Sequence, residues 1–153
     1  MKRLAVSIVV LSLLVCGGCR WSRMKLGLGY TVETPENESP EWVVQQVLKA
    51  AQMEPFADAW AEYSKYLHSS EKESAAAMQS WETLKFKALR NKHVCFLADA
   101  SKTSYVLMEE REERDDYQVL FVKCKTTDMP TPCHLFKDPN EGGKWRVKMN
   151  CLN

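Results

Sequence analysis

The chain has 153 residues, of which 45% are hydrophobic and 27% charged, and its mean hydropathy is −0.38. This composition excludes a disordered or collagen-like chain and a protein that crosses a membrane many times. The length suits one ordinary domain. Because 21 Lys and Arg are balanced by 20 Asp and Glu, the basic excess of a general nucleic-acid-binding protein is missing, and we expect no nucleic-acid partner.

The N-terminus has the pattern of an export signal. A positively charged start, residues 1–3, precedes twelve apolar or small residues, 4–15, which are too few for a membrane span of about 20 residues. The next four residues, Cys16-Gly17-Gly18-Cys19, resemble the lipobox of bacterial lipoproteins, in which small residues precede a Cys that is acylated. The resemblance implies acylation of Cys19, and Cys16 is the weaker candidate. The alternatives are an ordinary secretory signal cleaved nearby and an uncleaved anchor.

The lipoprotein resemblance divides the chain into three parts. We expect a signal peptide over residues 1–18, a lipidated N-terminus and flexible tether over 19–39, and a domain over 40–153. Several acyl chains hold a protein stably on a membrane, so membrane lipid is an expected partner. Arg20 follows the acceptor, where an Asp would retain the protein at the inner membrane, so the resemblance implies a cell-envelope protein on the outer membrane.

Three helices are expected after the tether. Ser39-Pro40-Glu41 is typical of a helix start, with a capping Ser, Pro at the first position and an early acidic residue. Pro55 separates this helix from a second one, in which apolar residues recur every three or four positions. The pattern Ser70-x-x-Glu73 is that of a capping box and predicts a third helix. The residues expected to face inward from the third helix are Ala77, Met78, Trp81, Leu84, Ala88 and Leu89.

Four strands are expected in the C-terminal half. They cover residues 104–111, 117–124, 131–137 and 145–149, and the charged run 109–116 is expected at a hairpin tip. Gly142-Gly143 suits the turn between the last two strands. Short connections favour antiparallel neighbours. The prediction is an α+β domain in which three N-terminal helices pack on one face of a four-stranded antiparallel sheet.

The order of these elements resembles the NTF2-like superfamily, the cystatin/NTF2-type cone. The resemblance depends on the helical pair over residues 40–67 and on the closing hairpin, Pro132–Lys137 and Gly143–Val147. It covers most of residues 40–150 and implies a curved sheet around a pocket. Enzymes of this class, such as ketosteroid isomerases, place a carboxylate and hydrogen-bond donors in that pocket. No single residue of this chain matches those positions.

Four cysteines follow the acylation site: Cys95, Cys124, Cys133 and Cys151. An even number in an exported domain favours disulfides, and four cysteines allow three pairings. If residues 128–129 form the hairpin centre, Cys124 faces Cys133, which leaves Cys95 with Cys151. The alternative, Cys133 with Cys151, also joins adjacent strands, because the Gly142-Gly143 turn places residue 151 near 134.

A metal site is the other use of these residues, but it is not expected. Cys124, Cys133, His134 and Cys151 include no closely spaced pair, and adjacent residues 133 and 134 point to opposite faces of a strand. We therefore expect no metal and no cofactor. His134 lies in the middle of a strand and is the candidate for the cone pocket, whereas His68 is expected to end a helix.

The sequence contains no phosphate loop, no Gly-x-Ser-x-Gly and no His-Glu-x-x-His. We therefore expect a non-catalytic envelope lipoprotein that binds an envelope protein or a small ligand. The alternative is an enzyme, an isomerase or hydrolase, that uses the cone pocket with His134 and a buried acid. A purely structural envelope component is the third possibility.

Overall fold

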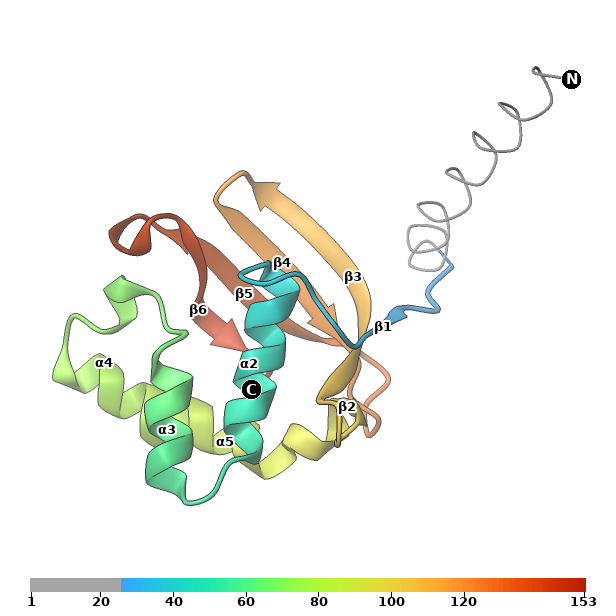
Figure 1. Ribbon diagram of the computed structural model, residues 1–153, viewed down its shortest axis with the longest axis horizontal. Coiled ribbons are helices and arrows are strands. Elements are labelled where there is room, and N and C mark those ends of the chain that lie inside the picture. The colour runs from blue at the N-terminus through green and yellow to red at the C-terminus, as the bar shows by residue number, and fades with distance from the viewer. Residues whose placement is uncertain (1–25) are drawn as a thin grey trace, which may run out of the picture.

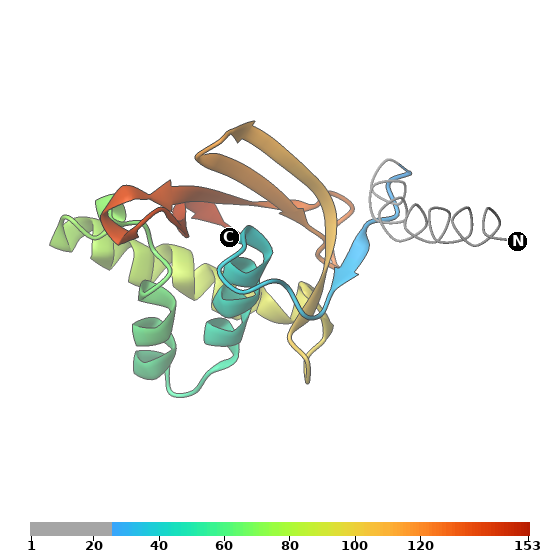
Figure 2. The ribbon, with the colours of Figure 1, turned by 45° about the horizontal axis from the view of Figure 1, so that its top comes forward.

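The structure is a computed structural model, and it describes residues 26–153 (Figure 1). The expected signal peptide, Cys16, Cys19 and Arg20 lie outside the described residues. In the described part the strands form one antiparallel sheet, and the helices lie against one of its faces (Figure 2). The expected α+β class, with helices covering one side of an antiparallel sheet, is therefore confirmed.

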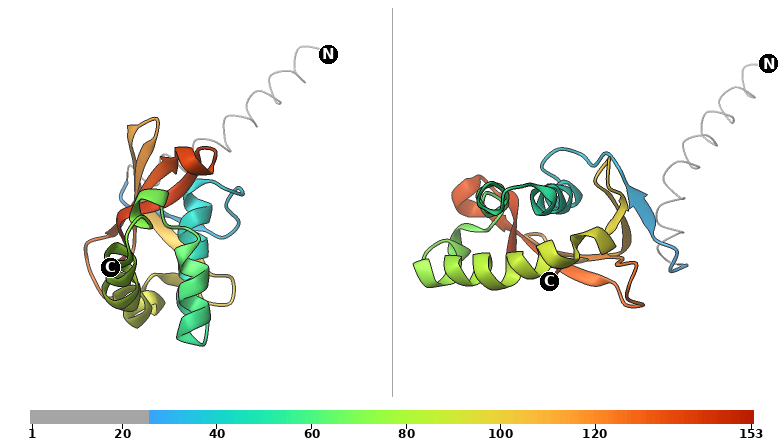
Figure 3. Two further views of the ribbon diagram at one scale, coloured as in Figure 1. Left: turned by 90° about the vertical axis from the view of Figure 1, so that its left-hand side faces the viewer. Right: turned by 90° about the horizontal axis from the view of Figure 1, so that it is seen from below.

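The helices occupy the expected region of the chain, between residues 40 and 95. The α-helices are α2 (Pro40–Gln52), α3 (Phe56–Ser64), α4 (Ala75–Ser80) and α5 (Lys87–Lys92), and a π-helix, η2 (Trp81–Phe86), joins the last two. The short 3-10 turns are η1 (Ser69–Glu71), η3 (His93–Cys95) and η4 (Pro139–Glu141). The continuous segment from α4 to α5 runs crosswise to α2 and α3 (Figure 3).

Helix α2 lies at the centre of the core. Its start is the expected one, because the Ser39 side chain accepts a hydrogen bond from the Trp42 backbone N–H at 3.1 Å and Pro40 occupies the first turn. Its valines, Leu48 and two alanines are at most 1% exposed, since the sheet and the segment from α5 to η3 both pack on it. The helix therefore anchors the two layers to each other.

The sheet has more strands than the sequence predicts. The strands are β1 (Tyr30–Val32), β2 (Leu97–Asp99), β3 (Ser104–Arg114), β4 (Tyr117–Val122), β5 (Thr131–Asp138) and β6 (Lys144–Cys151). Their order is β1-β3-β4-β5-β6, and β2 also pairs with β3. The positions of β3 to β6 are confirmed. The two additional strands have three residues each, which is too short for a visible alternation of apolar and polar residues.

Strand β1 lies inside residues 19–39, the segment expected to be a flexible tether. That expectation is wrong for residues 30–32, which pair with β3. The chain reaches the sheet edge through Gly29, whose φ is 62°. A Cβ atom at this position would lie 2.7 Å from Met108 Sδ and 2.8 Å from the Leu107 carbonyl oxygen. Only glycine permits this close approach in this backbone conformation.

The π-helix changes which residues of the third helical segment face the core. Trp81 and Phe86, five positions apart, are both buried, while Leu84 is 65% exposed. A π-turn contains more residues than an α-turn, so the core face moves by one position along the chain. The expectation that Leu84 and Ala88 face inward is therefore wrong. The predicted capping box is also wrong, because the Ser74 hydroxyl oxygen accepts from the Ala77 backbone N–H and caps α4.

The disulfide pairing follows the alternative prediction, Cys133 with Cys151, and joins Cys95 with Cys124. The pairing of Cys124 with Cys133 is wrong because Cys133 lies opposite Leu120 in the register of β4 and β5. That register places the hairpin centre at residues 126–127, two positions earlier than assumed.

Two features place residue 151 opposite residue 133: the turn pairs Leu135 with Val147, and a bulge in β6 follows. Between the two pairs, the single β5 residue His134 lies opposite three β6 residues, 148–150. Met149, inside the bulge, has a φ of 71°. The two extra residues bring Cys151 opposite Cys133 instead of Thr131, and both cysteines are buried.

Candidate functional site

The face of the sheet away from the helices carries a group of aromatic side chains. Successive side chains of a strand point to opposite faces, so Leu120 and Leu135 lie in the core and their neighbours point outward. We call the outward group on β4 and β5 the outer face; its residues are Tyr117, Val119, Phe121, His134 and Phe136. No described helix lies on this side of the sheet (Figure 2).

The rings of the outer face pack closely on one another. Tyr117 stacks on Phe136, with ring centroids 4.2 Å apart and an angle of 11° between the planes. Tyr117 also lies parallel to the His134 ring at 6.0 Å. The three rings form a continuous, partly exposed surface across two strands.

Cationic side chains from neighbouring strands cover the edges of this surface. The Arg111 guanidinium lies 4.6 Å from the centre of the Phe121 ring, and the Arg114 guanidinium lies 5.8 Å from that of Tyr117. Lys148 lies 5.5 Å from the centre of the Phe136 ring. The side chains of Arg111 and Arg114 remain 53% and 63% exposed, so their charges stay accessible to a partner.

His134 lies on the outer face and not in the interior of the domain, because its neighbours Cys133 and Leu135 face the core. Its expected place in a cone pocket is therefore wrong. Burial lowers the pKa of His134, against the opposing charge of Glu113, which favours the neutral imidazole at neutral pH. Its Nδ1 lies 2.8 Å from the Tyr117 hydroxyl oxygen, and a neutral ring can accept this hydroxyl proton. Burial also raises the pKa of Tyr117.

A shallow cavity of about 340 Å³ opens at the end of the outer face. It is lined by Glu113, Arg114, Tyr117 and Phe136. The charged tip of the β3–β4 hairpin, the exposed run expected at residues 109–116, thus adjoins the aromatic surface. This arrangement offers one carboxylate, one guanidinium and two ring edges to a ligand or a protein side chain.

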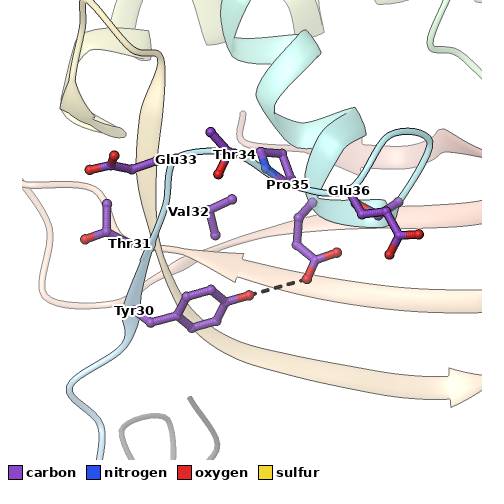
Figure 4. A pocket seen from close by; sticks show the side chains of 9 residues that line it. Tyr30, Thr31, Val32, Glu33, Thr34, Pro35 and Glu36 are labelled. Atoms are coloured by element: carbon purple, nitrogen blue, oxygen red, sulfur yellow. Dashed lines mark hydrogen bonds between the residues drawn. The ribbon is translucent and has the colours of Figure 1, made fainter. Parts of the chain in front are cut away.

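A second groove, also about 340 Å³, lies where the chain crosses from β1 to α2 (Figure 4). The Tyr30 ring points toward the start of α2, and its hydroxyl donates a hydrogen bond to Glu41 Oε1 at 3.3 Å. Glu33 and Glu36 also line this groove, which makes it acidic. Among residues 26–153, no group of His, Cys, Asp and Glu side chains lies close enough to hold a metal ion.

A Ser, His and Asp group occurs where α3 meets the end of β5, but its geometry is structural. Asp138 is 0% exposed, and its carboxylate accepts hydrogen bonds from the Ser69 backbone N–H at 2.6 Å and from the Ser69 hydroxyl at 3.0 Å. His68 Nδ1 lies 3.0 Å from the Ser70 hydroxyl and 4.0 Å from Asp138. A catalytic triad needs a different ring nitrogen for each partner, whereas one nitrogen faces both here.

The same contacts control the ionisation of Asp138. Burial acts to raise the pKa of Asp138, but the hydrogen bonds from Ser69 and from the Asn140 backbone N–H, with His68 nearby, hold it below the usual value of an Asp carboxyl. His68 caps the turn η1 by accepting from the Ser70 backbone N–H, so it begins a helical turn instead of ending a helix as expected. The group fastens the α3–η1 connection to the β5–β6 turn.

Sequence reasoning missed most of the outer face. From the sequence, only His134 of this face is a candidate, and no motif marks Tyr117, Phe121, Phe136, Arg111 or Arg114. The available signal is the strand at residues 117–122, which has apolar or aromatic residues at both odd-numbered and even-numbered positions. Such a strand has apolar side chains on both faces, whereas the helices can cover only one of them.

No described helix is long and apolar enough to cross a membrane. Comparison of the chain with models of protein families, with curated proteins and with solved structures finds no match.

Proposed function

We propose that this protein is a bacterial envelope lipoprotein, anchored through acylated Cys19, whose NTF2-like domain is a non-catalytic module that binds another envelope protein. The proposal of anchoring comes from the lipobox-like Cys16–Cys19 segment. The NTF2-like assignment is supported by the order of the elements, with a helical pair and a third helical segment before the long strands of an antiparallel sheet. The outer membrane is the proposed location, from Arg20.

The observation that carries the binding role is the outer face. Aromatic and Arg side chains dominate the energetic centres of protein interfaces. On the outer face both types occur together, and half-buried rings lie beneath exposed guanidinium groups. The mixed charges at its border, Glu109, Glu113, Arg111 and Arg114, suit a protein surface better than a uniformly charged polymer.

Site-specific photo-crosslinking in intact cells tests this role. A photoreactive phenylalanine analogue replaces Phe121 on the outer face and, in a matched control, Lys87, an exposed residue on the helical side. We expect a discrete crosslinked species from position 121 and none from position 87. Arg111→Ala in the position 121 background should abolish that species, because it removes the cation over the ring. Equal crosslinking from both positions would contradict the proposal.

Anchoring needs a separate test. Replacement of Cys19 by Ser should prevent labelling by a radioactive fatty acid and release the protein from washed membranes, or leave the precursor uncleaved. Cys16→Ser is the matched control and should keep both labelling and membrane association. Normal labelling of the Cys19→Ser variant would contradict acylation at this position.

A further inference from the structure

The two disulfides differ in their accessibility to solvent. Cys133 and Cys151, between β5 and β6, are 0% and 1% exposed. Cys95, at the end of η3, is only partly buried. It lines a cavity of about 410 Å³, whose other lining residues are Asn91, Lys92, Val94, Lys125 and Thr126. A reagent in solution can therefore approach the Cys95–Cys124 disulfide, whereas the other one is enclosed.

The cavity beside Cys95 is positively charged. Lys92 and Lys125 line it, and neither forms an ion pair within the part of the chain that the structure describes. A cavity of this size has room for a molecule as large as a tripeptide. Two uncompensated ammonium groups raise the local concentration of an anionic reagent and disfavour a cationic one.

The partner sulfur, that of Cys124, is placed to leave as a thiolate. Cys124 is 3% exposed, so attack from the cavity falls on Cys95. The Cys124 Sγ lies 3.0 Å from Thr126 Oγ1. A disulfide sulfur carries no hydrogen, so the Thr126 hydroxyl is the donor. The same hydroxyl stabilises the negative charge that forms on Cys124 when the disulfide is broken.

A backbone hydrogen bond keeps the two cysteines together without the disulfide. The Lys125 N–H donates to the Cys95 carbonyl oxygen at 2.9 Å. The segment after β4 therefore remains attached to η3 when the sulfurs separate, and the Cys124 thiolate stays close to Cys95. This proximity favours re-formation of the disulfide.

We propose that the Cys95–Cys124 disulfide is a thiol-disulfide exchange site for anionic low-molecular-weight thiols. The thiolate of the incoming molecule attacks Cys95 Sγ and forms a new sulfur-sulfur bond. The Cys95–Cys124 bond breaks, and its electron pair leaves with Cys124 as a thiolate. In the reverse step Cys124 attacks Cys95 and expels the incoming thiol, so the exchange needs no other oxidant or reductant.

The test compares two small thiols on the full-length protein purified in detergent. The probes are glutathione, which is anionic, and cysteamine, whose amino group is cationic. The reactions are stopped with acid, free thiols are alkylated, and peptides are mapped by mass spectrometry. We expect glutathione on Cys95, an alkyl group on Cys124, and an intact Cys133–Cys151 disulfide. Modification of both disulfides at equal rates, attachment to Cys124, or no adduct on the folded protein would overturn the proposal.

Charge variants test the role of the cavity. The double variant Lys92→Gln/Lys125→Gln should slow the reaction with glutathione by about fivefold and not slow the reaction with cysteamine. The matched control is Lys65→Gln/Lys144→Gln, which removes two lysines outside the cavity and should change neither rate. Equal slowing with both thiols, or no slowing, would overturn the preference for an anion.

Hydroxyl variants test the leaving group. Thr126→Val should slow the reaction of both thiols to a similar extent, because the hydrogen bond to the Cys124 sulfur is lost. Thr126→Ser keeps the hydroxyl and should keep the rate of the unaltered protein. Peptide mapping before the reaction verifies that each variant holds both disulfides, and circular dichroism verifies the fold. Equal rates for Thr126→Val and Thr126→Ser would overturn the role of the hydroxyl.

Discussion

The two faces of the sheet use similar residue types for different purposes. On the inner face, Leu120 and Leu135 are 0% exposed beneath the helices. On the outer face, Phe121 and Phe136 are half-buried beneath Arg and Lys side chains. The apolar content of a strand therefore does not identify the core face. What separates the faces is the covering layer, which is helical on one side and consists of long charged side chains on the other.

The largest expected effect concerns the helical layer that covers the inner face. Phe86→Ala should lower the free energy of unfolding by about 3–5 kcal/mol, because Phe86 is 0% exposed and packs 4.5 Å from the Tyr63 ring. Leu84→Ala, two positions earlier, should change it by less than about 0.5 kcal/mol, because Leu84 is exposed. Urea unfolding followed by circular dichroism measures both. A large effect at Leu84 with a small one at Phe86 would contradict the π-helical arrangement.

Substitutions at two neighbouring residues of β4, one on each face of the sheet, compare how much the two faces contribute to stability. Leu120→Ala should cost about 3 kcal/mol, because it leaves a cavity in the core. Phe121→Ala should cost about 1 kcal/mol, since it removes a partly exposed ring and its cation-π contact with Arg111. The same unfolding measurement applies. If Phe121→Ala cost as much as Leu120→Ala, the outer face would be part of a core.

The third prediction concerns the buried Asp138 carboxylate at the end of β5. Asp138→Asn should lower the stability at neutral pH by about 1–3 kcal/mol, because the amide replaces a carboxylate that accepts several hydrogen bonds. The pKa of Asp138 is lowered on folding, so its contribution is complete well above the pKa of an unfolded Asp carboxyl, about 4, and is lost as the pH falls through the folded-state pKa.

The unaltered protein should therefore lose more stability between pH 7 and pH 3 than the Asp138→Asn variant does. Asp128→Asn, in the exposed loop between β4 and β5, is the control and should behave like the unaltered protein. Unfolding curves at the two pH values give the comparison. Equal pH dependence in all three proteins would show that the Asp138 carboxylate does not contribute.

The sequence predicts those parts of the fold that have strong local signals. The cap at Ser39 and the glycines 142 and 143, both with positive φ, are confirmed where the pattern placed them. The four long strands are also confirmed, because each has enough residues to show a β pattern. Local propensity and turn chemistry were sufficient for these elements.

The remaining features depend on contacts between distant segments. The π-turn at Trp81 allows Phe86 to join the aromatic group around Tyr63, and helical periodicity alone assumes regular α-turns. The bulge around Met149 decides which residue of β5 lies opposite Cys151, and no turn signal marks it. The outer face was missed for a related reason, because only the arrangement of the layers shows which side of β4 the helices leave uncovered.

Strand β1 limits the distance over which the domain can act. With acylation at Cys19, as proposed, ten residues separate the lipid from the sheet edge at Tyr30, and even fully extended they reach only about 35 Å. A tether continuing to residue 39 would roughly double that radius. Because residues 30–32 are paired with the sheet edge, they cannot lengthen the tether. The outer face therefore stays close to the bilayer. Under the proposed anchoring, the protein partner of the outer face would therefore be one that comes close to the surface of the same membrane.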